Sequence, residues 1–153
     1  MRTGKASGFT YIGLLIIVAI AGIGLAAVGV MWKTEMQRER EKELLFIGKQ
    51  FSKALASYYK ATPGGIQQLP KTLDDLIIDK RFPMAKRHLR KLYLDPMTGK
   101  AEWGLLTEQG FITGVYSTSE EIPIKTSGFD ARQSGFAGAA SYSDWHFMFV
   151  SGS

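Results

Sequence analysis

The sequence predicts an α+β protein in which one long amino-terminal helix packs on a small antiparallel sheet. Three observations lead to this prediction. An uncharged, largely apolar run extends from Phe9 to Trp32. Apolar residues then recur at every third or fourth position as far as Tyr58, which is the spacing of a helix lying on a core. Short segments of β-type composition follow in the last third of the chain.

The run from Phe9 to Trp32 is long enough to cross a membrane as a helix. Its 24 residues would span about 36 Å, against a hydrocarbon core of about 30 Å. The charged side chains before it, Arg2 and Lys5, are both positive. Because basic flanks tend to remain in the cytoplasm, we expect residues 1–8 inside and the chain beyond Trp32 on the far side of the membrane.

Beyond Trp32 the helix is predicted to continue with an amphipathic pattern over residues 33–62. Its first part alternates in charge, and from Leu44 onward the apolar residues form one stripe. Pro63, Gly64 and Gly65 should end the helix near Ala61. The stripe that we expect to face the core comprises Leu44, Ile47, Phe51, Ala54 or Leu55, and Tyr58.

Residues 63–153 are predicted to form a globular head. Thr72 and Asp75 resemble a capping box that would open a short helix through about Asp79. Pro96 and Gly99 indicate a turn. The predicted strands are Ala101–Leu106, Phe111–Tyr116 and Asp144–Val150, the last with Trp145, Phe147 and Phe149 on one face and Asp144, His146 and Met148 on the other.

Composition and charge narrow the functions that the head could perform. The chain has 153 residues and no cysteine, so the head must fold without disulfides. Six of its basic residues lie between Lys80 and Lys91, a stretch without an acid. Such a run could contact phosphates, but no aromatic residue lies between Arg87 and Lys91 to stack on bases. We therefore expect a solvated surface or a contact with acidic neighbours, rather than nucleic acid.

The amino terminus carries an ordered motif: a short basic leader, then Gly8, Phe9 and Thr10, then the apolar run. This order resembles the amino terminus of type IV pilins and type II secretion pseudopilins. The resemblance implies a pilin-like fold, cleavage after Gly8 by a prepilin peptidase, and methylation of the new terminal amine of Phe9. Residues 1–8 would then be the leader and residues 9–32 the half of the helix used for membrane anchoring and assembly.

The segment Leu94–Gly99 resembles the Asp-Pro turn that opens the sheet of major pseudopilins, and the absence of cysteine fits that group. This second resemblance implies a structural subunit of a secretion fibre that catalyses no reaction. The subunit would be stored in the inner membrane with its head in the periplasm and then assembled there. The implied partners are other pseudopilin subunits, the prepilin peptidase, and an inner-membrane assembly platform with its ATPase.

One position departs from the family pattern. The family usually has glutamate five residues into the mature chain, where this sequence has Gly13. Either this subunit assembles by packing alone, or it occupies a fibre end, as the pseudopilin type that usually lacks the glutamate does. Gly22 and Ala26 form a small-xxx-small pair, which is typical of closely packed membrane helices.

Metal binding and catalysis have weaker support. The resemblance implies a calcium site before the last strand, for which Asp130 and Asp144 are the candidate ligands. Ca²⁺ requires six to eight oxygen ligands, so carbonyl groups and water would supply most of them. Ser141, Ser143 and His146 lie near Asp144 in the sequence, but strand alternation explains Asp144 and His146 as the polar face of the last strand, without a catalytic triad.

Other interpretations remain open at this point. The chain could be a pilin of a surface or DNA-uptake fibre, or a single-pass anchored binding module that keeps Met1. An anchored hydrolase would depend on His146. A secretory signal would be cleaved near Ala19–Ala21, but the apolar run continues to Trp32.

Overall fold

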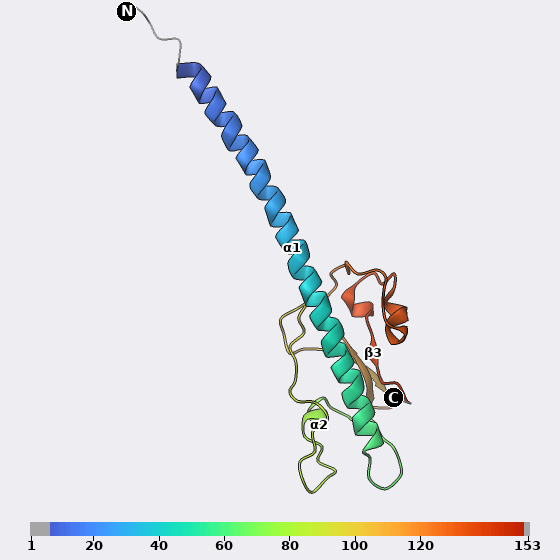
Figure 1. Cartoon of the computed structure of the whole chain (residues 1–153). Coiled ribbons are helices and arrows are strands. Elements are labelled where there is room, and N and C mark those ends of the chain that lie inside the picture. The colour runs from blue at the N-terminus through green and yellow to red at the C-terminus, as the bar shows by residue number, and fades with distance from the viewer. Residues whose placement is uncertain (1–6, 152–153) are drawn as a thin grey trace, which may run out of the picture. The chain divides into compact units, whose positions relative to one another are not determined.

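The computed structural model describes residues 7–151, apart from the side chains of residues 7–9 and 24–28. Internal contacts divide the chain into two units, Met1–Gln37 and Arg38–Ser153. The elements run in the order α1 (Ser7–Lys60), α2 (Asp74–Ile77), β1 (Gly104–Glu108), β2 (Phe111–Tyr116), η1 (Ala131–Phe136), η2 (Tyr142–Asp144) and β3 (Phe147–Met148), as Figure 1 shows. The predicted α+β class is confirmed.

Helix α1 agrees closely with the sequence-based bounds. Its carboxy-terminal end is capped by the Thr62 hydroxyl, which donates to the Tyr59 carbonyl at 3.0 Å. Gly64 and Gly65 follow with φ of 83° each, a conformation that favours glycine. Among the described residues, no helix has both the length and the apolar character that crossing a membrane requires.

The second half of α1 forms one wall of the core of the head. The whole predicted stripe is buried, with exposed fractions between 0 % and 7 % at Leu44, Ile47, Phe51, Ala54, Leu55 and Tyr58. Helix and sheet approach closely at Gly48, where an added Cβ would lie 2.1 Å from the ring of Phe147. Only glycine therefore allows α1 to contact β3 at this distance.

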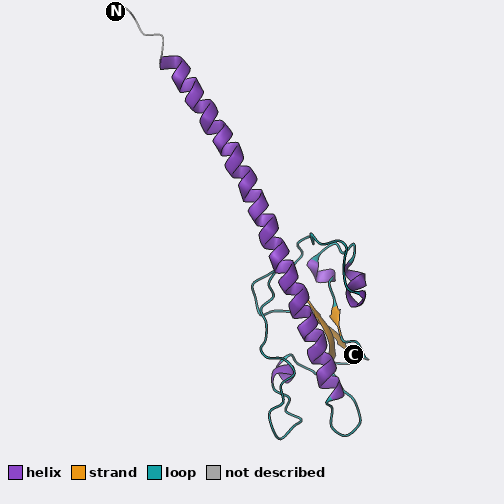
Figure 2. Cartoon of the chain, viewed as in Figure 1, coloured by secondary structure: helices purple, strands orange, loops and turns teal. Residues whose placement is uncertain are grey.

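The sheet has three antiparallel strands in the order β1-β2-β3 (Figure 2). A two-residue turn joins the first two, with φ of 52° at Gln109 and 83° at Gly110. Strand β1 begins three residues later than the predicted Ala101–Leu106 and extends two residues further, to Glu108. A register shift between Leu106 and Thr107 separates its two ends.

The last predicted strand is longer than the observed strand, but its buried and exposed faces were predicted correctly. Only Phe147 and Met148 pair with β2, because residues 142–144 form the 3₁₀ helix η2. The alternation nevertheless holds, since Trp145 and Phe147 are buried while Asp144, His146 and Met148 are exposed.

Two local predictions in the first part of the head can be compared with the structure. The Asp75 carboxylate accepts the Thr72 N–H at 3.0 Å, which is half of the predicted capping box. Helix α2 ends earlier than expected because Ile78 is extended and Asp79 forms a bridge with Lys86. The turn at Asp95 is confirmed, and the buried Asp95 carboxylate accepts the Ser117 hydroxyl at 2.7 Å.

Candidate functional site

The first half of α1 presents apolar side chains to its surroundings on every side. Leu14, Leu15, Ile16, Ile17 and Val18 are consecutive, and the least exposed of them, Leu15, is 50 % exposed. Successive residues of an α-helix are about 100° apart, so these five positions go around the whole circumference. A helix that is apolar all round requires an apolar environment, which the described residues of this chain do not provide.

The glycines of this half of the helix are open. An added Cβ at Gly13 or Gly22 would have no atom within 4 Å. Both positions therefore leave room for another helix, and Gly13 leaves room for the glutamate of the family pattern. Ala26, the partner of Gly22 in the predicted packing pair, lies outside the described side chains. Gly8 and Phe9 lie in the first turn of α1, and their side chains are also outside that set.

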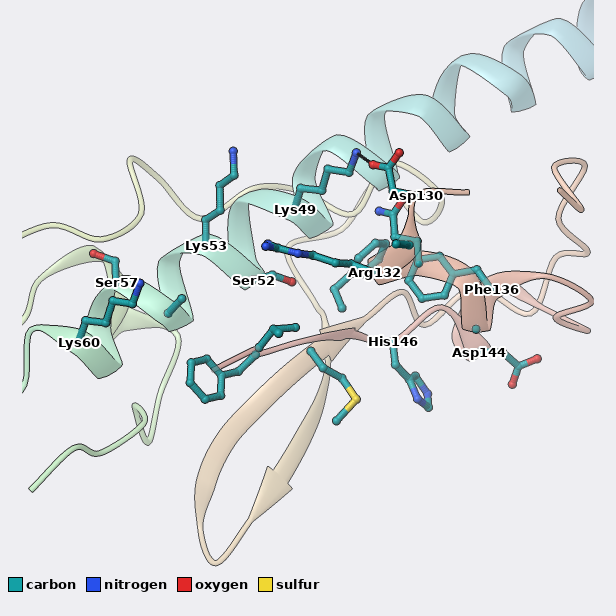
Figure 3. A pocket seen from close by; sticks show the side chains of 18 of the residues that line it. Lys49, Ser52, Lys53, Ser57, Lys60, Asp130, Arg132, Phe136, Asp144 and His146 are labelled. Atoms are coloured by element: carbon teal, nitrogen blue, oxygen red, sulfur yellow. Dashed lines mark hydrogen bonds and ion pairs between the residues drawn. The ribbon is translucent and has the colours of Figure 1, made fainter. Parts of the chain in front are cut away.

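The head contains a groove of about 1300 Å³ between α1 and the segment from η1 to β3 (Figure 3). Lys49, Lys53 and Lys60 line the α1 side, and Arg132 lines the opposite side. In this view Arg132 extends from η1 toward α1. The lining also includes a further base, Lys86, two acids, Asp130 and Asp144, and the aromatic residues Phe136, Phe147 and Phe149.

The charges of the groove are unevenly balanced. Lys49 forms an ion pair with Asp130, and this hydrogen bond lowers the pKa of the Asp130 carboxyl. In the described part of the chain, Lys53, Lys60 and Arg132 have no acidic partner. The groove is thus a basic surface over an aromatic floor.

The structure does not show a set of calcium ligands around the two predicted candidates, Asp130 and Asp144. The Asp130 carboxylate is directed to Lys49, whereas Asp144 accepts the backbone N–H groups of Ala140 and Ser141 at 3.0 and 3.1 Å. No group of three or more metal-binding side chains occurs within residues 7–151. The Asp144 contacts also explain the sequence cluster around His146, because Ser141 and Asp144 form the capping box of η2.

A buried polar cluster near the end of α1 was not predicted. The Arg81 guanidinium donates to both Asp79 carboxylate oxygens, at 2.9 and 2.7 Å, and lies 3.5 Å over the ring of Tyr58. On the other side, His88 Nε2 lies 3.1 Å from Asp79 Oδ2, and His88 Nδ1 lies 2.7 Å from the Ser57 hydroxyl. Because a carboxylate only accepts, Nε2 donates to Asp79, and the neutral ring accepts the Ser57 proton at Nδ1.

The electrostatics of this cluster keep Asp79 charged and His88 neutral. Burial alone would raise the pKa of Asp79, but hydrogen bonds from Arg81 and His88 outweigh it and bring the pKa to about 2. Burial lowers the pKa of His88, and the neighbouring Asp79 offsets this only in part. The cluster thus joins the loop of residues 79–88 to α1.

The serine, histidine and aspartate of this cluster do not form a catalytic site. The side chains of His88 and Asp79 are both 0 % exposed. Ser57 lies inside α1, where the surrounding N–H groups are used by the helix and cannot stabilise an oxyanion. The arrangement therefore stabilises the head, and it removes Arg81 from the basic run that the sequence indicated.

A second unpredicted contact fixes the loop that precedes η1. Glu41 Oε1 accepts the N–H groups of Ile124 and Lys125 at 2.7 and 2.9 Å and the Tyr142 hydroxyl at 3.0 Å. Glu41 precedes Leu44 by three residues and so lies on the buried stripe. An acid on a buried stripe is the sequence signal that could have identified this contact.

A comparison with known proteins found no matching family model, no matching curated protein and no matching solved structure.

Proposed function

We propose that this protein is a pseudopilin, a structural subunit of the periplasmic fibre of a type II secretion system, which is similar to a type IV pilus. The observation that carries the proposal is the contrast within α1. Its first half is apolar on every side and exposed, while its second half buries one stripe in a folded head. A fibre subunit needs both properties, since it must hold a compact head and also associate through an apolar helix.

The proposed life of the subunit has two stages. Residues 9–32 first anchor the protein in the inner membrane, with residues 1–8 in the cytoplasm and the head in the periplasm. This assignment rests on the uncharged run in the sequence, in which the side chains of residues 24–28 lie outside those described. In the second stage the same helix leaves the lipid and packs against copies of itself.

The partners follow from these two stages. A prepilin peptidase would cleave after Gly8 and methylate Phe9, and neighbouring subunits would cover the apolar helix in the fibre. Moving an apolar helix out of lipid is unfavourable for a single subunit, so an assembly platform with an ATPase must supply the work. The subunit itself performs no catalysis in this proposal, and its role is mechanical.

Mass spectrometry of the amino terminus of the native protein tests the proposal. The expected result is a mature chain that begins with methylated Phe9 and that is recovered in polymers. A protein that retains residues 1–8 and remains monomeric would instead be an anchored binding module, and the proposal would be wrong.

A pilin of a DNA-uptake fibre is the second candidate. The observation in its favour is that Lys86, Arg87, Arg90 and Lys91 remain exposed after Arg81 is used by Asp79. Salt-sensitive binding of DNA by the full-length protein, lost when Arg87, Arg90 and Lys91 are changed to glutamine, would favour this candidate over a secretion fibre.

A further inference from the structure

The basic groove of the head has the features of a binding surface for an acidic chain segment. Its rim carries Lys53, Lys60 and Arg132, all exposed. Phe136 and Phe147 are buried in its floor and Phe149 is half-buried. A partner that carries acids beside an apolar side chain would satisfy both parts of this surface.

The same chain presents such a segment elsewhere on the head. Glu120, Glu121 and Ile122 are consecutive and exposed, and Ile122 is 74 % exposed. Neither glutamate has a basic partner among the described residues, and none of the three lines the groove. The basic groove and the acidic segment are therefore two different surfaces of one head.

The acidic segment is held in place by its own backbone contacts. The Ser119 hydroxyl accepts the Glu121 N–H at 3.3 Å, and the Glu121 carbonyl accepts the Tyr142 N–H at 3.1 Å. Just beyond the segment, Glu41 binds the N–H groups of Ile124 and Lys125. A segment fixed before binding loses less conformational entropy when it is bound.

We propose that the basic groove of one subunit receives the Glu120–Ile122 segment of a second copy of this chain. The glutamates meet Lys53, Lys60 and Arg132, and Ile122 covers part of the aromatic floor. Because the two surfaces differ, the contact is heterologous and cannot form a closed two-fold dimer, and in the proposed fibre its repetition links successive heads in an open chain. The inference deepens the proposed function, on which it rests, by naming a contact between heads.

The absence of native cysteine makes a crosslinking test specific. The full-length variant Lys53→Cys/Glu121→Cys, assembled with its export apparatus and oxidised, should give a ladder of dimers, trimers and larger species. Each single variant should give no ladder, because a chain with one thiol cannot be linked twice. The matched control Lys100→Cys/Glu108→Cys also replaces an exposed base and an exposed acid, both outside the two surfaces, and should remain largely monomeric.

Charge exchange gives an independent reading of the same contact. The Lys53→Glu/Lys60→Glu variant and the Glu120→Lys/Glu121→Lys variant should each assemble poorly alone, and a mixture of the two should recover assembly. A cysteine pair that stays monomeric in fibres made from methylated subunits would overturn the inference and leave the proposed function intact. Subunits that retain residues 1–8 and never polymerise would overturn both.

Discussion

The two halves of α1 contain similar apolar residues but differ in what covers them. In the second half, Leu44 and Phe51 are 0 % exposed, whereas in the first half Ile16 is 54 % exposed. The glycines differ in the same way, because Gly48 touches Phe147 while Gly22 has open space around it. The second half thus stabilises this chain, and the first half has apolar surface available for lipid or for other subunits.

The largest expected effect separates the two halves directly. Phe51→Ala should destabilise the head by about 3–5 kcal/mol, because it leaves a cavity against Trp103 and Tyr93. Ile16→Ala should change the stability of the head by less than about 0.5 kcal/mol, since its side chain contributes nothing to that core. Urea unfolding of the full chain in detergent, followed by the fluorescence of the two tryptophans of the head, Trp103 and Trp145, with Trp32→Phe in the background, measures both. Equal losses in the two variants would contradict the division.

The buried cluster predicts an acid-sensitive head. The pKa of Asp79 is about 2 in the folded chain, against an ordinary value of 3.8, so its ionisation contributes about 2 kcal/mol above pH 4 that is lost as the pH falls toward 2. His88 acts in the same direction at higher pH, because its folded pKa is lowered. Below about pH 6.5 the unfolded chain binds a proton at His88, whereas the folded chain binds it only at a lower pH. Stability therefore falls as the pH falls.

Unfolding curves recorded from pH 7 to pH 3 measure this effect. The His88→Gln variant should lose less stability than the parent chain between pH 7 and pH 5, and Asp79→Asn should lose less below pH 4. A parent chain whose stability is constant over this range would show that the cluster does not act as described.

A smaller difference in the stability of the head is expected between a substitution at a closely packed glycine and one at an open glycine. Gly48→Ala should cost about 1–3 kcal/mol, because its Cβ would overlap the buried ring of Phe147. Gly22→Ala should leave the head unchanged, since nothing lies within 4 Å of its Cβ. Thermal unfolding of the two variants measures the difference, and a Gly48→Ala head as stable as the parent would mean that the helix and β3 are less closely packed.

The substitution expected to affect the head least is at Gly13, where we expect an effect on assembly instead. Gly13→Glu should leave unfolding of the head unchanged, because the position is outside its core. If the missing charge marks a subunit at a fibre end, this variant should alter incorporation or fibre length, as measured by electron microscopy. Unchanged fibres would remove the fibre-end interpretation and leave assembly by packing alone.

The sequence predicted the helix and its buried stripe well because both depend on a regular period. Leu44, Phe51 and Tyr58 could be assigned to the core from spacing alone, and Gly64 marked the helix end. The burial of Trp145 and Phe147 was also predicted correctly, because the side chains alternate between buried and exposed even where the backbone does not pair with β2.

The remaining features depend on contacts between distant residues and could not be read in the same way. The groove is lined by both Lys53 and Arg132, which are 79 positions apart in the sequence, and no local pattern encodes that arrangement. Arg81 and His88 belong to the basic run from Lys80 to Lys91, and nothing in that run indicated that both would bind the preceding residue, Asp79. In both places the tertiary fold determines which charges have a partner.

The central claim is that the first half of α1 is covered by lipid before assembly and by neighbouring helices afterwards. Since the chain has no cysteine, a spin label at Ile16→Cys reports on this half alone, with Ile66→Cys in the exposed part of the head as the matched control. Before assembly, the label at position 16 should be accessible to oxygen in the lipid and inaccessible to a water-soluble relaxer. In fibres it should lose access to both and show spin–spin broadening from adjacent subunits, while the label at position 66 stays accessible to water in both states. A label at position 16 that is open to the water-soluble relaxer in both states would contradict the account.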